Sequence, residues 1–134
     1  MCSSDLQLDD TQPFGIDPVP VAAISTPDCV QGFCLTDRAV VLSISWGLSS
    51  SYLQMHDVEK LTVQGTYTIG GQEVPLLYID SASLTESVKA PPMSEGIVWH
   101  DGRIYVLNES ASNQYIFGKL LSGNHLYSYA PYED

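Results

Sequence analysis

The chain has 134 residues, the size of one domain, and 44% of them are hydrophobic, with ten glycines and eight prolines. This composition describes a folded, turn-rich protein rather than a disordered one. Sixteen acidic residues against five basic ones give a formal charge of -11, which repels phosphate backbones and anionic lipid and excludes nucleic acid as an expected partner. No run of residues approaches the length of an apolar membrane span, so none is expected.

The chain opens at residues 1–6 with Met-Cys-Ser-Ser-Asp-Leu, which the nucleotides GTG TGC TCT TCC GAT CT encode. That string resembles the end of a sequencing-library adapter, as in a translated metagenomic read. We therefore predict that residues 1–6 are a non-native leader and that the N-terminal part of the parent chain is lost. The cellular location stays unknown, with an extracytoplasmic bacterial setting suspected.

Two of the three cysteines, Cys29 and Cys34, stand five residues apart. On one strand this spacing puts their side chains on opposite faces, so no disulfide is expected between them. No spacing typical of a metal site is present either. We interpret both as small buried apolar residues.

Three blocks of sequence recur in the same order along the chain. The first recurs at an offset of 96 − 32 = 64, the second at 106 − 41 = 65, and the third at 63, with the extra residue placed in a turn. Such self-similarity predicts a repeated unit. The paired blocks are 27–33 with 91–97, 41–45 with 106–110, and Tyr52-Leu53 with Tyr115-Ile116.

Two dipeptides predict tight β-hairpins. Asp101-Gly102 supplies the positive φ at both central positions that a type I′ turn requires, and Gly70-Gly71 joins two alternating runs. The segment 81–91 is predicted to be an outer strand, or a short helical turn, that leads into the next inner strand. In the hairpin at Asp101-Gly102, the simplest register places Glu95 opposite Asn108.

Repeats of four antiparallel strands with inner hairpins are typical of β-propeller blades. We therefore predict an all-β fold, an antiparallel propeller-like repeat of about two blades within residues 7–134, in units of about 18–80 and 81–134. The alternative is a small β-sandwich. Two blades cannot close a ring, so the expected partners are the missing blades of the parent chain or further copies of this chain.

A resemblance supports the propeller interpretation. The Gln-Gly strand and serine-ended strand at 27–45, followed by the Pro-x-Met-Ser-Glu-Gly strand and the strand ending in Glu-Ser at 91–112, resemble the last two blades of an uncharacterised group of bacterial six-bladed propeller proteins. The resemblance covers residues 27–117 and implies a fold rather than an activity. The chain departs from that group in Cys29, in Cys34 and in its inserted hairpin.

Polar residues at strand ends are the candidate ligand-binding residues. In a propeller blade the inner strand starts, and the second strand ends, at the face where ligand sites usually lie. Polar side chains from both units are therefore expected to gather near one mouth of the channel. These candidates are Gln31, Ser43 and Ser45 in the first unit and Glu95, Asn108 and Glu109 in the second.

Two roles compete for these residues. In one, Glu95 and Asn108 contribute oxygen ligands to a metal such as Ca²⁺ in the full-length parent, with Gln31 nearby, as in lactone-hydrolysing propellers. In the other, Glu95 or Glu109 accepts hydrogen bonds that tie one blade to the next. The resulting hypothesis is a fragment of a binding or scaffolding propeller of unknown ligand, and the alternative is part of a metal-dependent hydrolase.

Other residues carry weaker signals. The three histidines share no spacing that makes a metal site, and no nucleophile elbow or triad is recognisable, so catalysis by this chain is not expected. Trp46 and Tyr52 could stack on a sugar, although aromatic residues at such positions are more often core between blades.

Overall fold

The computed structural model describes Thr11, residues 19–109 and residues 125–132. Apart from one short 3-10 helix, η1 (Val58–Lys60), the regular structure of this part is β, which confirms the predicted all-β class. The predicted leader at 1–6 lies outside the described residues. The strands are β1 (Ala23–Ser25), β2 (Val30–Leu35), β3 (Ala39–Ile44), β4 (Ser51–Asp57), β5 (Thr62–Ile69), β6 (Gln72–Tyr78), β7 (Leu84–Ala90), β8 (Ser94–His100), β9 (Arg103–Asn108) and β10 (Tyr127–Tyr129).

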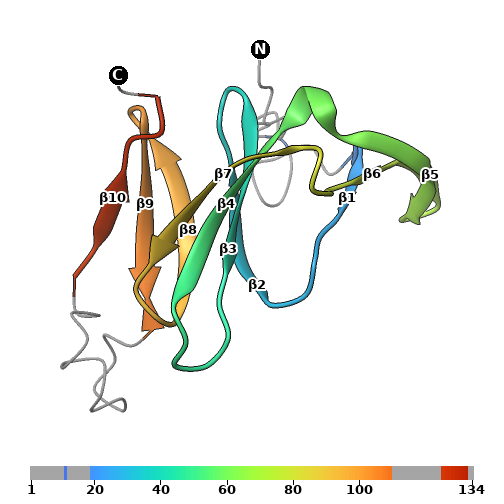
Figure 1. Ribbon diagram of the computed structural model, residues 1–134. Helices are drawn as coiled ribbons and strands as arrows, with labels where there is room; N and C mark the ends of the chain where they lie inside the picture. The colour runs from blue at the N-terminus through green and yellow to red at the C-terminus, as the bar shows by residue number, and fades with distance from the viewer. Residues whose placement is uncertain (1–10, 12–18, 110–124, 133–134) are drawn as a thin grey trace.

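These strands form three open sheets. The central sheet has the order β2-β3-β4-β7, the C-terminal sheet the order β10-β9-β8, and the arm sheet the order β1-β6-β5. Figure 1 shows the central sheet between the other two, with the β5–β6 hairpin of the arm sheet projecting away. All described strand pairs are antiparallel except β1 with β6.

Both predicted hairpin turns are confirmed. Asp101 and Gly102 have φ of 46° and 75° and join β8 to β9. Gly70 and Gly71 have φ of 59° and 85° and join β5 to β6. Positive φ at both central positions is the type I′ geometry, whose twist matches that of the flanking strands.

The β2–β3 and β8–β9 hairpins share local geometry at a spacing of 64 residues. Cys29 and Met93 precede the first strands with left-handed φ of 65° and 61°, and 93 − 29 = 64. Their carbonyl oxygens accept hydrogen bonds from the backbone N–H groups of Ser45, at 3.1 Å, and Glu109, at 2.8 Å. Each of these bonds closes the open end of its hairpin.

The ladders of the two hairpins correct the predicted spacing of the second strands. Leu35 pairs with Val40, and Trp99 pairs with Ile104, so the offset is 99 − 35 = 64 and also 104 − 40 = 64. The predicted extra residue in the turn is therefore wrong.

A β-bulge corrects the register at the start of β8. The register shifts between Ser94 and Ile97, and Ser94 lies opposite Asn108. The predicted pairing of Glu95 with Asn108 is therefore wrong. A similar irregularity lies at the start of β2, and such bulges re-aim the side chains beside them.

The segment 81–91 forms the outer strand β7, which pairs with β4 in the central sheet. The strand alternative is confirmed, and the helical alternative is wrong. The predicted unit boundary near residue 80 thus falls within one sheet. The third strand of the C-terminal sheet is β10, and the strand predicted at Tyr115-Ile116 lies outside the described residues.

The core lies between the central sheet and the C-terminal sheet. The two sheets come so close at Gly32 that a Cβ atom there would stand 2.5 Å from the carbonyl oxygen of Glu95. A residue without a side chain is therefore required at this position. The buried members of the core are Cys34, Ala39, Val41, Leu53, Met55, Ala90, Ile104 and Val106.

Cys29 and Cys34 are both free thiols, as expected. Cys34 is buried in the core, and burial raises the pKa of its thiol to about 11. A thiol that stays protonated in this way behaves as a small apolar residue. Cys29 is only partly buried, and its left-handed backbone was not predicted.

Candidate functional site

The structure brings four of the six candidate residues to one pocket of about 250 Å³, lined by Gln31, Ser45, Glu95 and Glu109 together with Trp46, Gly47 and Met93. We call it the strand-end pocket. It lies where β2 and β8 start and where β3 and β9 end. The side chains of the two hairpins therefore meet at one edge of the paired sheets.

The equivalence of the hairpins explains why these residues converge. Gln31 and Glu95 occupy equivalent bulge positions, and 95 − 31 = 64. Ser45 and Glu109 both donate a backbone N–H to a left-handed residue across the hairpin mouth. Because β2 and β8 lie against each other at Gly32, both sets reach the same pocket.

The electrostatics of the pocket are set by two carboxyl groups. Partial burial, the negative charge of Glu109 and a hydrogen bond between the two side chains all raise the pKa of Glu95, with burial the largest cause. Two carboxylates in contact favour a state in which they share one proton. The pocket therefore attracts a cation that could replace that proton.

Trp46 forms part of the pocket wall but is not a core residue. Its side chain is 75% exposed, so the interpretation of Trp46 as core between blades is wrong. It precedes Gly47, whose φ of 57° turns the chain after β3. An exposed indole beside two carboxyl groups can cover one face of a bound ligand.

The other two candidates, Ser43 and Asn108, lie inside the protein and do not line the pocket. Ser43 is fully buried, and its hydroxyl is 2.7 Å from that of Ser94. Asn108 is 1% exposed, and neither polar atom of its amide has a hydrogen-bond partner among the described residues.

Buried serines tie the two sheets together at the inner side of the pocket. The backbone N–H of Ser94, in β8, donates to the hydroxyl of Ser51, in β4, at 3.1 Å. Ser51 in turn donates to Ser45 at 3.0 Å, and Ser43 contacts Ser94 as described above. The tie between units that was predicted for the acids is thus made by serines in this region, and Ser51 and Ser94 were missed by the sequence interpretation.

The oxygen donors of the pocket match Ca²⁺ in kind but are few. Two carboxylates, an amide and a hydroxyl are hard ligands, whereas Ca²⁺ takes about 6–8 oxygens. Among the described residues no group of three or more His, Cys, Asp and Glu side chains could hold a metal ion. A calcium site here would require further ligands.

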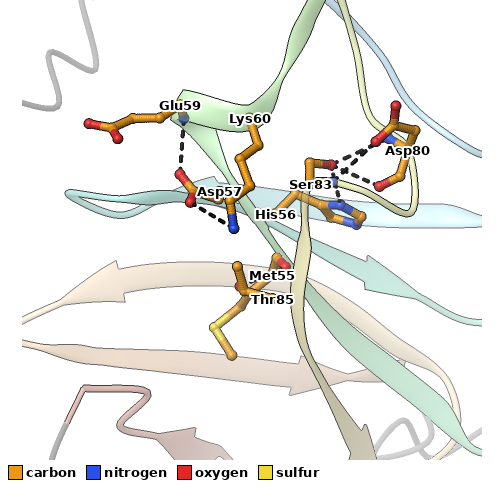
Figure 2. Close-up of polar contacts among 8 residues, drawn as sticks. All are labelled: Met55, His56, Asp57, Glu59, Lys60, Asp80, Ser83 and Thr85. Atoms are coloured by element: carbon orange, nitrogen blue, oxygen red, sulfur yellow. Dashed lines mark hydrogen bonds and ion pairs between the residues drawn. The ribbon is translucent and has the colours of Figure 1, made fainter.

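A second polar cluster surrounds His56 at the far end of β4 (Figure 2). His56 is 3% exposed, and its Nδ1 is 3.0 Å from the hydroxyl of Ser83. That hydroxyl donates to the backbone carbonyl of Asp80 at 2.8 Å, and the Asp80 carboxylate accepts from the backbone N–H of Ser83 at 3.1 Å. The cluster holds the chain in place before β7 begins.

The environment of His56 predicts that acid destabilises the fold. Burial lowers the pKa of His56, an effect that Asp80 opposes, and its Nε2 is buried without a partner among the described residues. The unfolded chain therefore binds a proton more readily, so stability should fall as pH drops below about 6.5, the unperturbed pKa. Urea unfolding at about pH 7.5 and about pH 5.5 should show this loss, and His56→Gln should reduce it. An equal loss in the variant would contradict the assignment to His56.

Comparison with protein-family models, with curated proteins and with solved structures gave no match. In the described part of the chain, no helix has the length and apolar character needed to cross a membrane. The functional argument therefore depends on the residues and geometry given above.

Proposed function

We propose that the chain is part of a β-propeller binding protein whose ligand occupies the strand-end pocket. Three observations support the propeller interpretation. Two antiparallel sheets that follow each other along the chain pack face to face, their first hairpins are equivalent at 64 residues, and the outer strand β7 runs directly into β8. In a propeller, this is how one blade leads to the next.

The observation that carries the proposed function is the contact between Glu95 and Glu109 in one pocket with Gln31 and Ser45. An ammonium or guanidinium group placed between the two carboxyl groups would gain charge-assisted hydrogen bonds. The amide and hydroxyl can orient neutral polar parts of the same molecule. The exposed ring of Trp46 adds an aromatic face for a cation. The ligand class is therefore a small polar molecule with a cationic group.

The alternative is a metal-dependent propeller hydrolase. The oxygen donors of the pocket favour this alternative in kind, since a hard cation prefers carboxylate and amide oxygens. A bound metal would supply Lewis-acid activation of a substrate or water. Further blades would have to provide the remaining ligands, whereas a cationic organic ligand needs only the pair of acids.

Titration with arginine amide, and separately with Ca²⁺, tests the proposal by calorimetry and tryptophan fluorescence. We expect the chain to bind arginine amide and expect Glu95→Gln and Glu109→Gln to weaken binding roughly 10- to 100-fold, because each removes a charged hydrogen-bond acceptor. Glu73→Gln is the matched control, since Glu73 is exposed on β6 and makes the same change in net charge. This control should bind as the wild type does.

The pH dependence of binding gives a second measurement of the same site. A cation must displace the proton that Glu95 and Glu109 share, and the raised pKa of Glu95 keeps that proton bound to higher pH than usual. Binding should therefore strengthen as pH rises above about 4.5. Binding of Ca²⁺ alone would favour the hydrolase, and binding that both substitutions leave unchanged would contradict either use of the pocket.

A further inference from the structure

The two hairpins pack against each other through different faces. The β2–β3 hairpin contributes the face that carries Gly32, Cys34 and Val41, and the β8–β9 hairpin contributes the face that carries Ile104 and Val106. Because the hairpins are equivalent at a spacing of 64, this contact is head to tail. A head-to-tail contact uses one face of each hairpin and leaves the other face free for the same contact again.

The C-terminal sheet repeats the docking face of the central sheet on its outer side. Gly96, Val98 and Tyr105 stand 64 residues after Gly32, Cys34 and Val41. They line an apolar pocket of about 630 Å³ together with Leu107 and Leu126. Val98 is 55% exposed and Leu107 is 58% exposed. In Figure 1 this sheet stands at one end of the row of three.

The two equivalent glycines differ only in whether a neighbour is present. A Cβ at Gly32 would stand 2.5 Å from the carbonyl oxygen of Glu95, whereas a Cβ at Gly96 would have no atom within 4 Å. Gly96 is not among the residues with positive φ, so the fold of the described chain does not itself require glycine there. Its place matches that of a glycine which another backbone approaches closely.

The same chain carries a surface that suits this free face. Phe33 stands 64 residues before Ile97, which packs on the core from the C-terminal sheet. Phe33 is 64% exposed, and Tyr52, on the same face of the central sheet, is 43% exposed. The central sheet thus presents an aromatic surface where the C-terminal sheet presents its packed face.

We propose that the outer face of the C-terminal sheet docks on the Phe33 surface of a second copy of this chain, with Gly96 against the β2 backbone of that copy. The contact repeats the one seen between the two sheets of a single chain. It depends on the equivalence of the hairpins and is independent of the ligand proposed for the strand-end pocket.

Side-chain chemistry at the paired positions agrees with this contact. Within the chain, Ser43 meets Ser94 at 2.7 Å. The positions that would meet between copies are Leu107, which is 107 − 43 = 64 residues later, and Val30, which is 94 − 30 = 64 residues earlier. An exposed apolar pair thus replaces a hydrogen-bonded pair, and burial on association would stabilise it.

Sedimentation velocity over a range of protein concentrations tests the docking. The charge of -11 opposes association, so the measurement is made at about 0.15 M salt, where screening acts over about 8 Å. We expect concentration-dependent association of the wild type. Gly96→Val places a side chain where a backbone should approach and is expected to weaken association roughly 10- to 100-fold. Phe33→Asp is expected to do the same from the other surface.

A mixture of the two variants distinguishes this arrangement from a symmetric one. The Gly96→Val chain keeps its Phe33 surface, and the Phe33→Asp chain keeps its Gly96 face, so one contact can still form between them. The mixture should therefore form a one-to-one dimer and no larger species. Val63→Asp, on the exposed strand β5, is the control and should associate as the wild type does.

Urea unfolding of each variant, measured at a concentration at which it is monomeric, shows whether the fold is intact. Both variants should unfold near the wild-type midpoint, because both sites are exposed or open in the single chain. The proposal is overturned by a wild type that stays monomeric at all concentrations, by folded Gly96→Val protein that associates as tightly as the wild type, or by a mixture that forms no dimer.

Discussion

Gly32→Ala is expected to destabilise the fold by about 1–3 kcal/mol, the range of overpacked interiors. The added Cβ would stand 2.5 Å from the carbonyl oxygen of Glu95 and 3.3 Å from the Cα of Gly96. Both neighbours are backbone atoms of β8, which cannot turn aside as a flexible side chain could. The central and C-terminal sheets would have to separate locally, and the core between them would lose contacts.

Gly96→Ala is the matched control, because it makes the same chemical change at the equivalent position with no atom within 4 Å of the new Cβ. It should be neutral or stabilising by up to about 1 kcal/mol, since glycine inside a strand is less favourable than alanine. Urea unfolding at a concentration where the chain is monomeric measures both variants. Equal stability of the two would show that the sheets do not approach as closely at Gly32 as the structure places them.

The parts of the fold that local chemistry dictates were predictable. A type I′ turn needs positive φ at two successive positions, and Asp101-Gly102 and Gly70-Gly71 supply it without help from the rest of the chain. Residues 81–91 alternate polar and apolar side chains, which is typical of a strand with one covered face. The outer strand β7 follows from that pattern.

The bulges were not predictable, because side-chain alternation does not reveal where one extra residue enters a strand. The single-residue shift at Glu95 changed the partner of Asn108 from Glu95 to Ser94. The left-handed backbone of Cys29 and Met93 has no signal in residue type either, since glycine and asparagine are the residues that usually adopt it. Only the surrounding hydrogen bonds explain it.

The candidate site was predictable in outline from topology. Residues at the starts of β2 and β8 and the ends of β3 and β9 had to gather at one edge once two hairpins packed side by side. The parts that were missed depend on contacts between distant segments, such as Ser51 with Ser94. The strand β10 has three residues, too few for a periodic pattern to be recognised.

Ile104→Ala is expected to cost about 2–5 kcal/mol of folding free energy, the range for removing most of a buried aliphatic side chain. Ile104 is fully buried on β9 and belongs to the cluster formed by both sheets, so the cavity would open between two strand layers that cannot easily close on it. Val63→Ala is the control, since Val63 on β5 is 63% exposed and should change stability by less than about 0.5 kcal/mol. Urea unfolding at a concentration where the chain is monomeric measures both. If Ile104→Ala cost no more than the control, the two sheets would not share one core, and the stacking on which the pocket and the docking face depend would be refuted.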